Sequence, residues 1–171
     1  LAQGHLGAQT NSDQGPAAAL ANLNDAIATR DADGKYATMF YGLLDPQGHL
    51  ICCNGGHNPP FLVGKNGTRR LETGGMPVGM FPGAQYEEES LTMEPGDFLV
   101  IFSDGVSEAL NADEEEFEDE RILDSIESAS DTTAVVQLQH LFSSVKSFTA
   151  GAAQNDDVTV LVVSYRGEST G

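Results

Sequence analysis

The sequence predicts an α+β domain of layered sheets and flanking helices, with the strands paired mainly through hairpins. The first observation is the order of periodic segments: a helix, five or six strands, two consecutive helices and a last strand. The second is that short turns rich in glycine, proline, aspartate and asparagine separate neighbouring strands. The third is the apolar run 98–102, which is bounded by turn residues and is typical of a strand buried on both faces.

Length and charge limit the classes of function. The chain has 171 residues, the size of one domain, and contains no apolar run long enough to cross a bilayer. Eight basic residues against 26 acidic ones give a formal net charge of −18. This charge argues against nucleic acid or anionic lipid as a partner, because both bind basic surfaces, and it is compatible with cation binding.

The cysteines and the N-terminal residues favour a cytoplasmic location. Cys52 and Cys53 are adjacent, so we expect two reduced thiols facing a core rather than a disulfide. Residues 1–15 are polar and rich in glycine, without the pattern of a secretion signal. We expect residues 1–15 to be a flexible or linker segment, residues 16–167 the folded domain and residues 168–171 a tail.

A helix opens the predicted domain. Pro16 suits the first turn of a helix, and apolar residues then recur on one face up to residue 30. The segment 31–34, with two acids and a glycine, ends the helix. It lacks most positions of a calcium-binding EF-hand loop, so we interpret it as a turn.

The middle of the chain predicts strands. Turns at residues 45–48 and 65–68 predict two hairpins, and the glycine-rich stretch 71–82 predicts a loop. The segments with the apolar or alternating pattern of strands are residues 36–44, 49–54, 61–63, 86–93 (an edge strand) and 98–102.

The C-terminal part predicts two helices and a last strand. Residues 121–128 and 132–148 have helical periodicity, with Asp131 as the N-cap of the second helix. Residues 158–165 form a β-branched strand. We interpret the acidic run 113–120 as a solvated loop, with calcium binding as the alternative.

Two acidic positions lie at strand ends. Asp104 follows the central strand, and the pair Asp156 and Asp157 precedes the last one. If these two strands are antiparallel neighbours, Asp104 and Asp156 meet at one edge of the sheet. Converging carboxylates repel each other unless a divalent cation lies between them, and oxygen-only ligation favours Mg²⁺ or Mn²⁺ over Zn²⁺. Such a site supports hydrolysis of phosphate esters, although an Asp-Gly pair is also a common turn.

Five short segments carry a resemblance to a known family. They occur in this order: Tyr36–Gly42, Gly56–Pro60, Pro95–Asp97, Ser103–Ala109 and Asp156–Thr159. Together they resemble the SpoIIE/RsbU-type serine/threonine phosphatases, the bacterial branch of the metal-dependent protein phosphatase 2C-like (PPM) superfamily. The resemblance implies a β-sandwich of two mainly antiparallel sheets flanked by helices, with Mn²⁺ or Mg²⁺ at one end and two ions in the complete domain.

The resemblance also implies roles for particular residues. Asp104 and Asp156 would be catalytic metal ligands, and Gly105 and Asp157 would belong to the same metal site. Three further residues would lie around the ligands or on the substrate side, and these are Thr38, His57 and Asn58.

The implied substrate is phosphoserine or phosphothreonine on a regulatory protein of bacterial sigma-factor signalling, an antagonist of the STAS type. The resemblance further implies an upstream sensor or receiver domain in the parent protein. Relatives carry Gly-Asp-x-x-Asp-type and Asp-x-x-Gly-type motifs upstream, and residues before Gly15 match neither. We therefore expect an N-terminally truncated domain that is inactive or incomplete alone.

Two alternatives follow from these observations. A pseudophosphatase, or a fragment that acts as a partner-binding module, agrees with the missing upstream motifs. A cation-buffering domain would instead depend on the acidic run 113–120. We also expect a truncated sheet to expose an edge through which the chain forms a homodimer.

Overall fold

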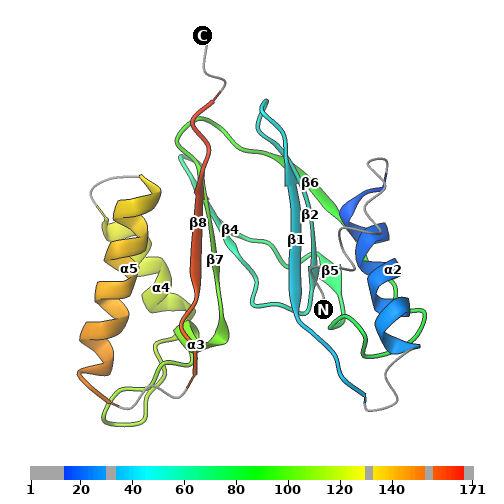
Figure 1. The fold of residues 1–171 in the computed structure, drawn as a ribbon. Coiled ribbons are helices and arrows are strands. Elements are labelled where there is room, and N and C mark those ends of the chain that lie inside the picture. Colours follow the sequence, from blue (N-terminus) through cyan, green and yellow to red (C-terminus); the bar gives the residue numbers. More distant parts are fainter. Residues whose placement is uncertain (1–13, 30–33, 130–132, 153–155, 168–171) are drawn as a thin grey trace. The chain divides into compact units, whose positions relative to one another are not determined.

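A computed structural model describes residues 14–29, 34–129, 133–152 and 156–167 (Figure 1). The chain divides into two compact units, each with its own sheet; the described helices are α2 in the first unit and α3, α4 and α5 in the second. The first unit comprises residues up to Pro59 together with Leu71–Met93. The second unit comprises Pro60–Arg70 and residues 94–167. The mixed α+β class, with antiparallel sheets and flanking helices, confirms the predicted fold class.

The first unit is a sheet built around β2. Strand β2 pairs with β1 in an antiparallel hairpin, from Met39 opposite Gly55 to Leu44 opposite Leu50. On its other side, β2 pairs with β6 in antiparallel orientation and with β5 in parallel orientation. The described elements are α2 (Pro16–Ala28), β1 (Met39–Leu44), β2 (His49–Gly55), β5 (Gly74–Gly75) and β6 (Glu89–Thr92).

Helix α2 packs on the sheet of the first unit through its apolar stripe (Figure 1). Leu20 and Leu23 are almost completely buried and form a cluster with Cys53 and Val78, against which Ile27 also packs. These three helical residues are those that the sequence places on one face of a helix. Their burial is what holds α2 to strand β2.

The two cysteines are reduced and buried, as predicted. Cys52 and Cys53 are neighbours on β2, so their side chains leave opposite faces of the sheet. Burial, with a smaller contribution from the Glu88 carboxylate, raises the pKa of the Cys53 thiol from 9.0 to about 11. At neutral pH this thiol stays protonated.

The second unit is an antiparallel sheet in the order β4-β3-β7-β8. Strand β7 is central, as the apolar run predicts, and pairs with β3 on one side and β8 on the other. The described elements are β3 (Phe61–Gly64), β4 (Gly67–Arg70), β7 (Phe98–Phe102), α3 (Asp104–Ser107), α4 (Glu118–Ser128), α5 (Ala134–Thr149) and β8 (Val160–Ser164).

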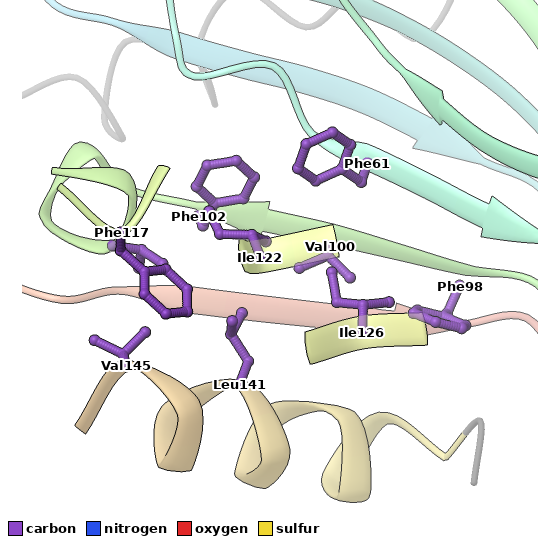
Figure 2. Close-up of a cluster of buried hydrophobic side chains, with 10 residues drawn as sticks. Phe61, Phe98, Val100, Phe102, Phe117, Ile122, Ile126, Leu141 and Val145 are labelled. Atoms are coloured by element: carbon purple, nitrogen blue, oxygen red, sulfur yellow. The ribbon is translucent and has the colours of Figure 1, made fainter. Parts of the chain in front are cut away.

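Helices α4 and α5 cover one face of this sheet and share its core with β3 and β7 (Figure 2). The rings of Phe61 and Phe102 stack with their centroids 5.5 Å apart. Leu141 and Val145, four residues apart on α5, point into the same cluster. The strand end that carries Asp104 is therefore anchored to a packed core.

Several predicted boundaries differ from those in the structure. The first strand begins at Met39, because residues 36–38 make only an isolated bridge between Ala37 and Val78. The acidic run 113–120 is not a loop throughout, since Glu118, Asp119 and Glu120 form the first turn of α4. Acidic side chains are favourable there because they face the positive end of the helix dipole.

Two short elements were missed. The stretch 71–82 contains β5, where Gly74 approaches the backbone of Asn54 so closely that no side chain would fit. Asp104 and Gly105 do not form a simple turn but begin the one-turn helix α3. Asp131 lies outside the described residues, as do the boundary segments 1–13 and 168–171. Thr133 occupies the N-cap position of α5.

None of the helices in the described ranges has both the length and the apolar character needed to span a membrane.

Candidate active site

The central feature of the candidate site is the antiparallel pair of β7 and β8. Phe102 at the end of β7 lies opposite Val160 at the start of β8. The ladder continues beyond the strands, because the Ser103 amide donates to the Thr159 carbonyl at 3.0 Å. The segment that follows β7 and the segment that precedes β8 therefore meet at one sheet edge, as the sequence predicts for antiparallel neighbours.

The Ser103 hydroxyl joins these two segments. It donates to the Asp157 carbonyl oxygen at 2.9 Å and accepts from the Thr159 amide at 3.0 Å. One side chain thus bonds the backbone on both sides of Val158. Ser103 was part of a recognised motif but was not predicted as a site residue, and only its place directly before Asp104 could have indicated this role.

Gly105 is the point of closest approach between the segments. A Cβ atom at this position would lie 2.5 Å from the Asp157 carbonyl oxygen and 3.4 Å from the carbonyl carbon of Asp156. Both of these are backbone atoms, so neither could move away as a flexible side chain could. Glycine is therefore required at this position by the backbone of the segment that precedes β8. This contact shows that the segment of Asp104 and Gly105 lies against that of Asp156 and Asp157.

The carboxylates at this edge are oriented by their own backbone. Asp104 Oδ1 accepts from the Gly105 amide at 2.9 Å, and Asp156 Oδ1 accepts from the Asp157 amide at 2.7 Å. Asp104, Asp156 and Asp157 are all exposed. Two oriented, solvent-accessible carboxylates on adjoining segments offer the hard oxygen donors that Mg²⁺ and Mn²⁺ prefer.

The described residues supply only part of a ligand set. Within the described ranges, no group of three or more histidine, cysteine, aspartate or glutamate side chains is arranged to hold a metal ion. The donor chemistry of Asp104 and Asp156 fits a divalent cation, and the number of donors falls short of its usual six or more.

The predicted residues Thr38, His57 and Asn58 belong to the first unit, whereas Asp104 belongs to the second. Thr38 is exposed just before β1. Buried Asn54 holds the His57 loop, since its side chain accepts from the His57 amide at 2.8 Å and donates to the His57 carbonyl at 2.9 Å. The His57 ring donates from Nδ1 to the Asn58 carbonyl at 2.8 Å. These bonds give His57 and Asn58 a role in loop geometry.

A cavity of about 380 Å³ adjoins the candidate site in the second unit. It is lined by Gly105 and Asp156 of the site and also by Glu108, Phe142 and Lys146, among others. Sequence reasoning missed these last three residues as functional candidates. Phe142 and Lys146 lie four residues apart on α5, whereas Glu108 directly follows α3, so no local sequence signal unites all three.

The chain matches a known family over most of its length. The family model described as Stage II sporulation protein E (SpoIIE) matches residues 2–166. Protein IcfG of Synechocystis sp. is 33% identical over 146 residues, which are 84% of this chain and 23% of that protein. Phosphoserine phosphatase RsbU of Bacillus subtilis is 31% identical over 96 residues, which are 54% of this chain and 29% of that protein. The chain thus spans about a quarter of the length of these two relatives.

Solved structures share the fold at low sequence identity. The Mn-presoaked phosphatase domain of SpoIIE from Bacillus subtilis matches with a TM-score of 0.69 and 20% identity, over 99% of this chain and 74% of that one. The SiaA-PP2C domain of Pseudomonas aeruginosa matches with a TM-score of 0.79 and 16% identity, over 96% and 68%. RsbX in complex with magnesium matches with a TM-score of 0.62 and 16% identity, over 94% and 69%.

The fold is therefore that of the PP2C-like phosphatase domains. Within that class, the match over residues 2–166 shows that the chain belongs to the SpoIIE family, in the SpoIIE/RsbU-type branch of the PPM phosphatases. The resemblance stated from the five sequence segments is confirmed.

Proposed function

We propose that this chain is part of a Mn²⁺- or Mg²⁺-dependent phosphatase domain that hydrolyses phosphoserine or phosphothreonine on a regulatory protein. The observation that carries the proposal is the contact between two segments at the edge of β7 and β8, one with Asp104 and Gly105 and the other with Asp156 and Asp157. Family membership supports it, because the relative RsbU is named a phosphoserine phosphatase.

Asp104 and Asp156 would hold the cations through their carboxylates, with Gly105 and Asp157 contributing further oxygen atoms. When bound, such a cation lowers the pKa of a water molecule and neutralises charge on phosphate oxygens. The amides of Gly105 and Asp157 fix the two carboxylates before any ligand arrives. Ser103 keeps the segments together by bonding both sides of Val158.

The attacking group would be water rather than a cysteine side chain. Cys52 and Cys53 are both buried, and burial raises the pKa of Cys53 to about 11. A thiol that is buried and protonated at neutral pH cannot attack phosphorus as a thiolate. The proposal is therefore direct hydrolysis without a phosphoenzyme.

The remaining metal ligands would come from the upstream acidic motifs that the resemblance implies. Two carboxylates alone hold a divalent cation weakly, because such ions prefer six or more oxygen donors. We therefore expect the isolated chain to bind metal weakly and to be inactive or incomplete, and the natural full-length protein to bind it tightly.

A pseudophosphatase or partner-binding module is the second candidate function. The observation that favours it is that the described residues form no group of three acidic, histidine or cysteine ligands. Such a protein would retain the fold and the partner but would not hydrolyse phosphate esters.

The partners are also proposals. The substrate would be a phosphorylated antagonist of the STAS type in sigma-factor regulation, in the cytoplasm, with a sensor or receiver domain controlling the phosphatase. We further propose that strand β1, which among the described strands pairs only with β2 and carries the half-exposed side chains of Leu43 and Leu44, supports a homodimer.

The test is hydrolysis of p-nitrophenyl phosphate and of phosphoserine peptides by the natural full-length protein, with and without Mn²⁺. Mn²⁺-dependent turnover that falls at least 100-fold in the Asp104→Asn and Asp156→Asn variants would support the proposal. Asp113→Asn, which removes one exposed charge outside the site, is the matched control and should keep full activity. Absence of turnover in the unaltered protein would favour the partner-binding module instead.

A further inference from the structure

The cavity beside Asp156 lies in a strongly acidic molecule but has apolar walls. Its volume of about 380 Å³ is within the range of small-ligand pockets, and it is large enough for a long side chain. Leu110, Val145 and Phe142 line it. Phe142 as a whole residue is 41% exposed, so part of its surface faces solvent.

The charged groups of the cavity have a net negative sum. Glu108, Glu116 and Asp156 contribute three carboxylates, and Lys146 contributes one ammonium group. Glu108 and Glu116 are both exposed. The cation that Asp156 is proposed to hold neutralises that carboxylate when it is bound. Lys146 can compensate one of the other two charges, so at least one remains. The chain as a whole, at a net charge of −18, adds to the negative potential.

We propose that this cavity binds an arginine or lysine side chain of the phosphoprotein substrate, close in sequence to the phosphorylated residue. The inference rests on the proposed function, because it takes the substrate to be a phosphoprotein bound at Asp104 and Asp156. An arginine or lysine has a long aliphatic stem that packs on Leu110 and Val145. Its cationic head reaches the carboxylates or the face of Phe142.

The charges also exclude other occupants. An aspartate or glutamate side chain would meet at least one uncompensated carboxylate and be repelled. A leucine side chain would pack on the same walls but would leave Glu108 and Glu116 without a new partner. The cavity therefore selects for positive charge.

The experiment measures binding and hydrolysis of fluorescein-labelled phosphoserine peptides by the natural full-length protein with Mn²⁺. Each peptide has an alanine background with a single arginine at one position from −4 to +4, and matched peptides carry leucine or glutamate there. Fluorescence anisotropy is read at about 50 mM salt, where screening is moderate. We expect an arginine at one position to bind about fivefold more tightly than leucine there, and glutamate more weakly than both.

Three variants separate the cavity from the overall charge. Glu116→Gln should reduce the preference for arginine over leucine about threefold. Lys146→Gln should increase this preference, because it removes the cation that competes with the substrate. Glu114→Gln is the matched control: it removes the same charge two residues from Glu116 at an exposed position that does not line the cavity, and it should leave the preference unchanged.

Equal binding of the arginine and leucine peptides at every position would overturn the inference. So would an equal effect of Glu116→Gln and Glu114→Gln, since this would mean that only the overall charge matters. Hydrolysis of p-nitrophenyl phosphate, measured in the same samples, reports separately on the proposed function. A preference for arginine that follows the variants while no phosphate ester is hydrolysed would support the cavity and contradict the phosphatase.

Discussion

At the scale of single residues, the structure depends on buried polar side chains that bond the backbone of loops. Asn24 on α2 has no exposed surface. It accepts from the Gly79 amide at 2.9 Å and donates to the Phe81 carbonyl at 2.9 Å. Asn54 on β2 does the same for the His57 loop. Each amide side chain replaces backbone partners that a glycine- and proline-rich loop cannot provide for itself.

We predict that Asn24→Ala lowers the free energy of unfolding by about 2–4 kcal/mol, because the buried Gly79 amide and the part-buried Phe81 carbonyl lose their partner and a cavity remains. Urea denaturation followed by circular dichroism measures this loss. Asn22→Ala, on the same helix but exposed, is the matched control and should cost less than about 0.5 kcal/mol. Similar losses in both variants would contradict the role of Asn24.

Cys53 makes stability depend on pH in the alkaline range. Its pKa is about 11 in the folded chain and 9.0 ordinarily, because burial disfavours the thiolate. The unfolded chain therefore releases this proton at lower pH than the folded chain. The resulting stabilisation is fully present below pH 9 and is lost as the pH rises from 9 to 11.

We predict that the unaltered chain loses about 2–3 kcal/mol more of its free energy of unfolding between pH 8 and pH 11 than the Cys53→Ala variant does. The comparison uses the change with pH, so the packing cost of the substitution cancels. Parallel pH profiles for the two proteins would contradict this account of Cys53.

At the scale of elements, the sequence predicted those features that depend on residues close together in the chain, such as turns and apolar runs. The turns at 45–48 and 65–68 predicted the β1–β2 and β3–β4 hairpins, and the apolar run 98–102 predicted the central strand β7. Strand β5 was missed because the strand it pairs with, β2, lies about twenty residues away in the sequence. Its own residues are two glycines, of which Gly74 lies against the backbone of Asn54.

The candidate site was likewise predicted only in part, because some of its contacts join residues that are distant in the sequence. The meeting of Asp104 and Asp156 followed from a single assumption, that β7 and β8 are antiparallel neighbours, and the register confirms that assumption. The link through Ser103 depends on how the segments after β7 and before β8 pack, and the cavity with Phe142 and Lys146 depends on how α5 packs beside them. No periodicity or spacing in the sequence encodes that packing.

Helix α5 packs on its sheet through one buried side. Substitution of two adjacent residues, one buried and one exposed, tests this orientation. Leu141 is 1% exposed in the core of the second unit, whereas the neighbouring Phe142 is 41% exposed. We predict that Leu141→Ala lowers the free energy of unfolding by about 2–5 kcal/mol, because it leaves a cavity in the cluster. Phe142→Ala should cost about 1 kcal/mol or less. Thermal denaturation of the two variants measures both, and a larger loss for Phe142→Ala would contradict the orientation of α5.

At the scale of the whole molecule, the net charge of −18 is the main electrostatic feature. Like charges repel one another in the compact state, and salt screens this repulsion. We therefore predict that the midpoint of thermal unfolding rises by several degrees when NaCl increases from 0.05 to 0.5 M. A constant or falling midpoint would mean that attractive ion pairs such as Arg70 with Asp119 outweigh the repulsion.

The central claim is that the segments after β7 and before β8 hold a cation, and the paramagnetic effect of Mn²⁺ on amide signals tests it most directly. In a titration of the 171-residue chain followed by nuclear magnetic resonance, the amides of Gly105 and Asp157 should broaden first, and Asp104→Asn should abolish this selective broadening. Amides of the hairpin at 65–68, at the other end of the same unit's sheet, should remain sharp. Broadening centred on the acidic run 113–120, or unaffected by Asp104→Asn, would contradict the claim.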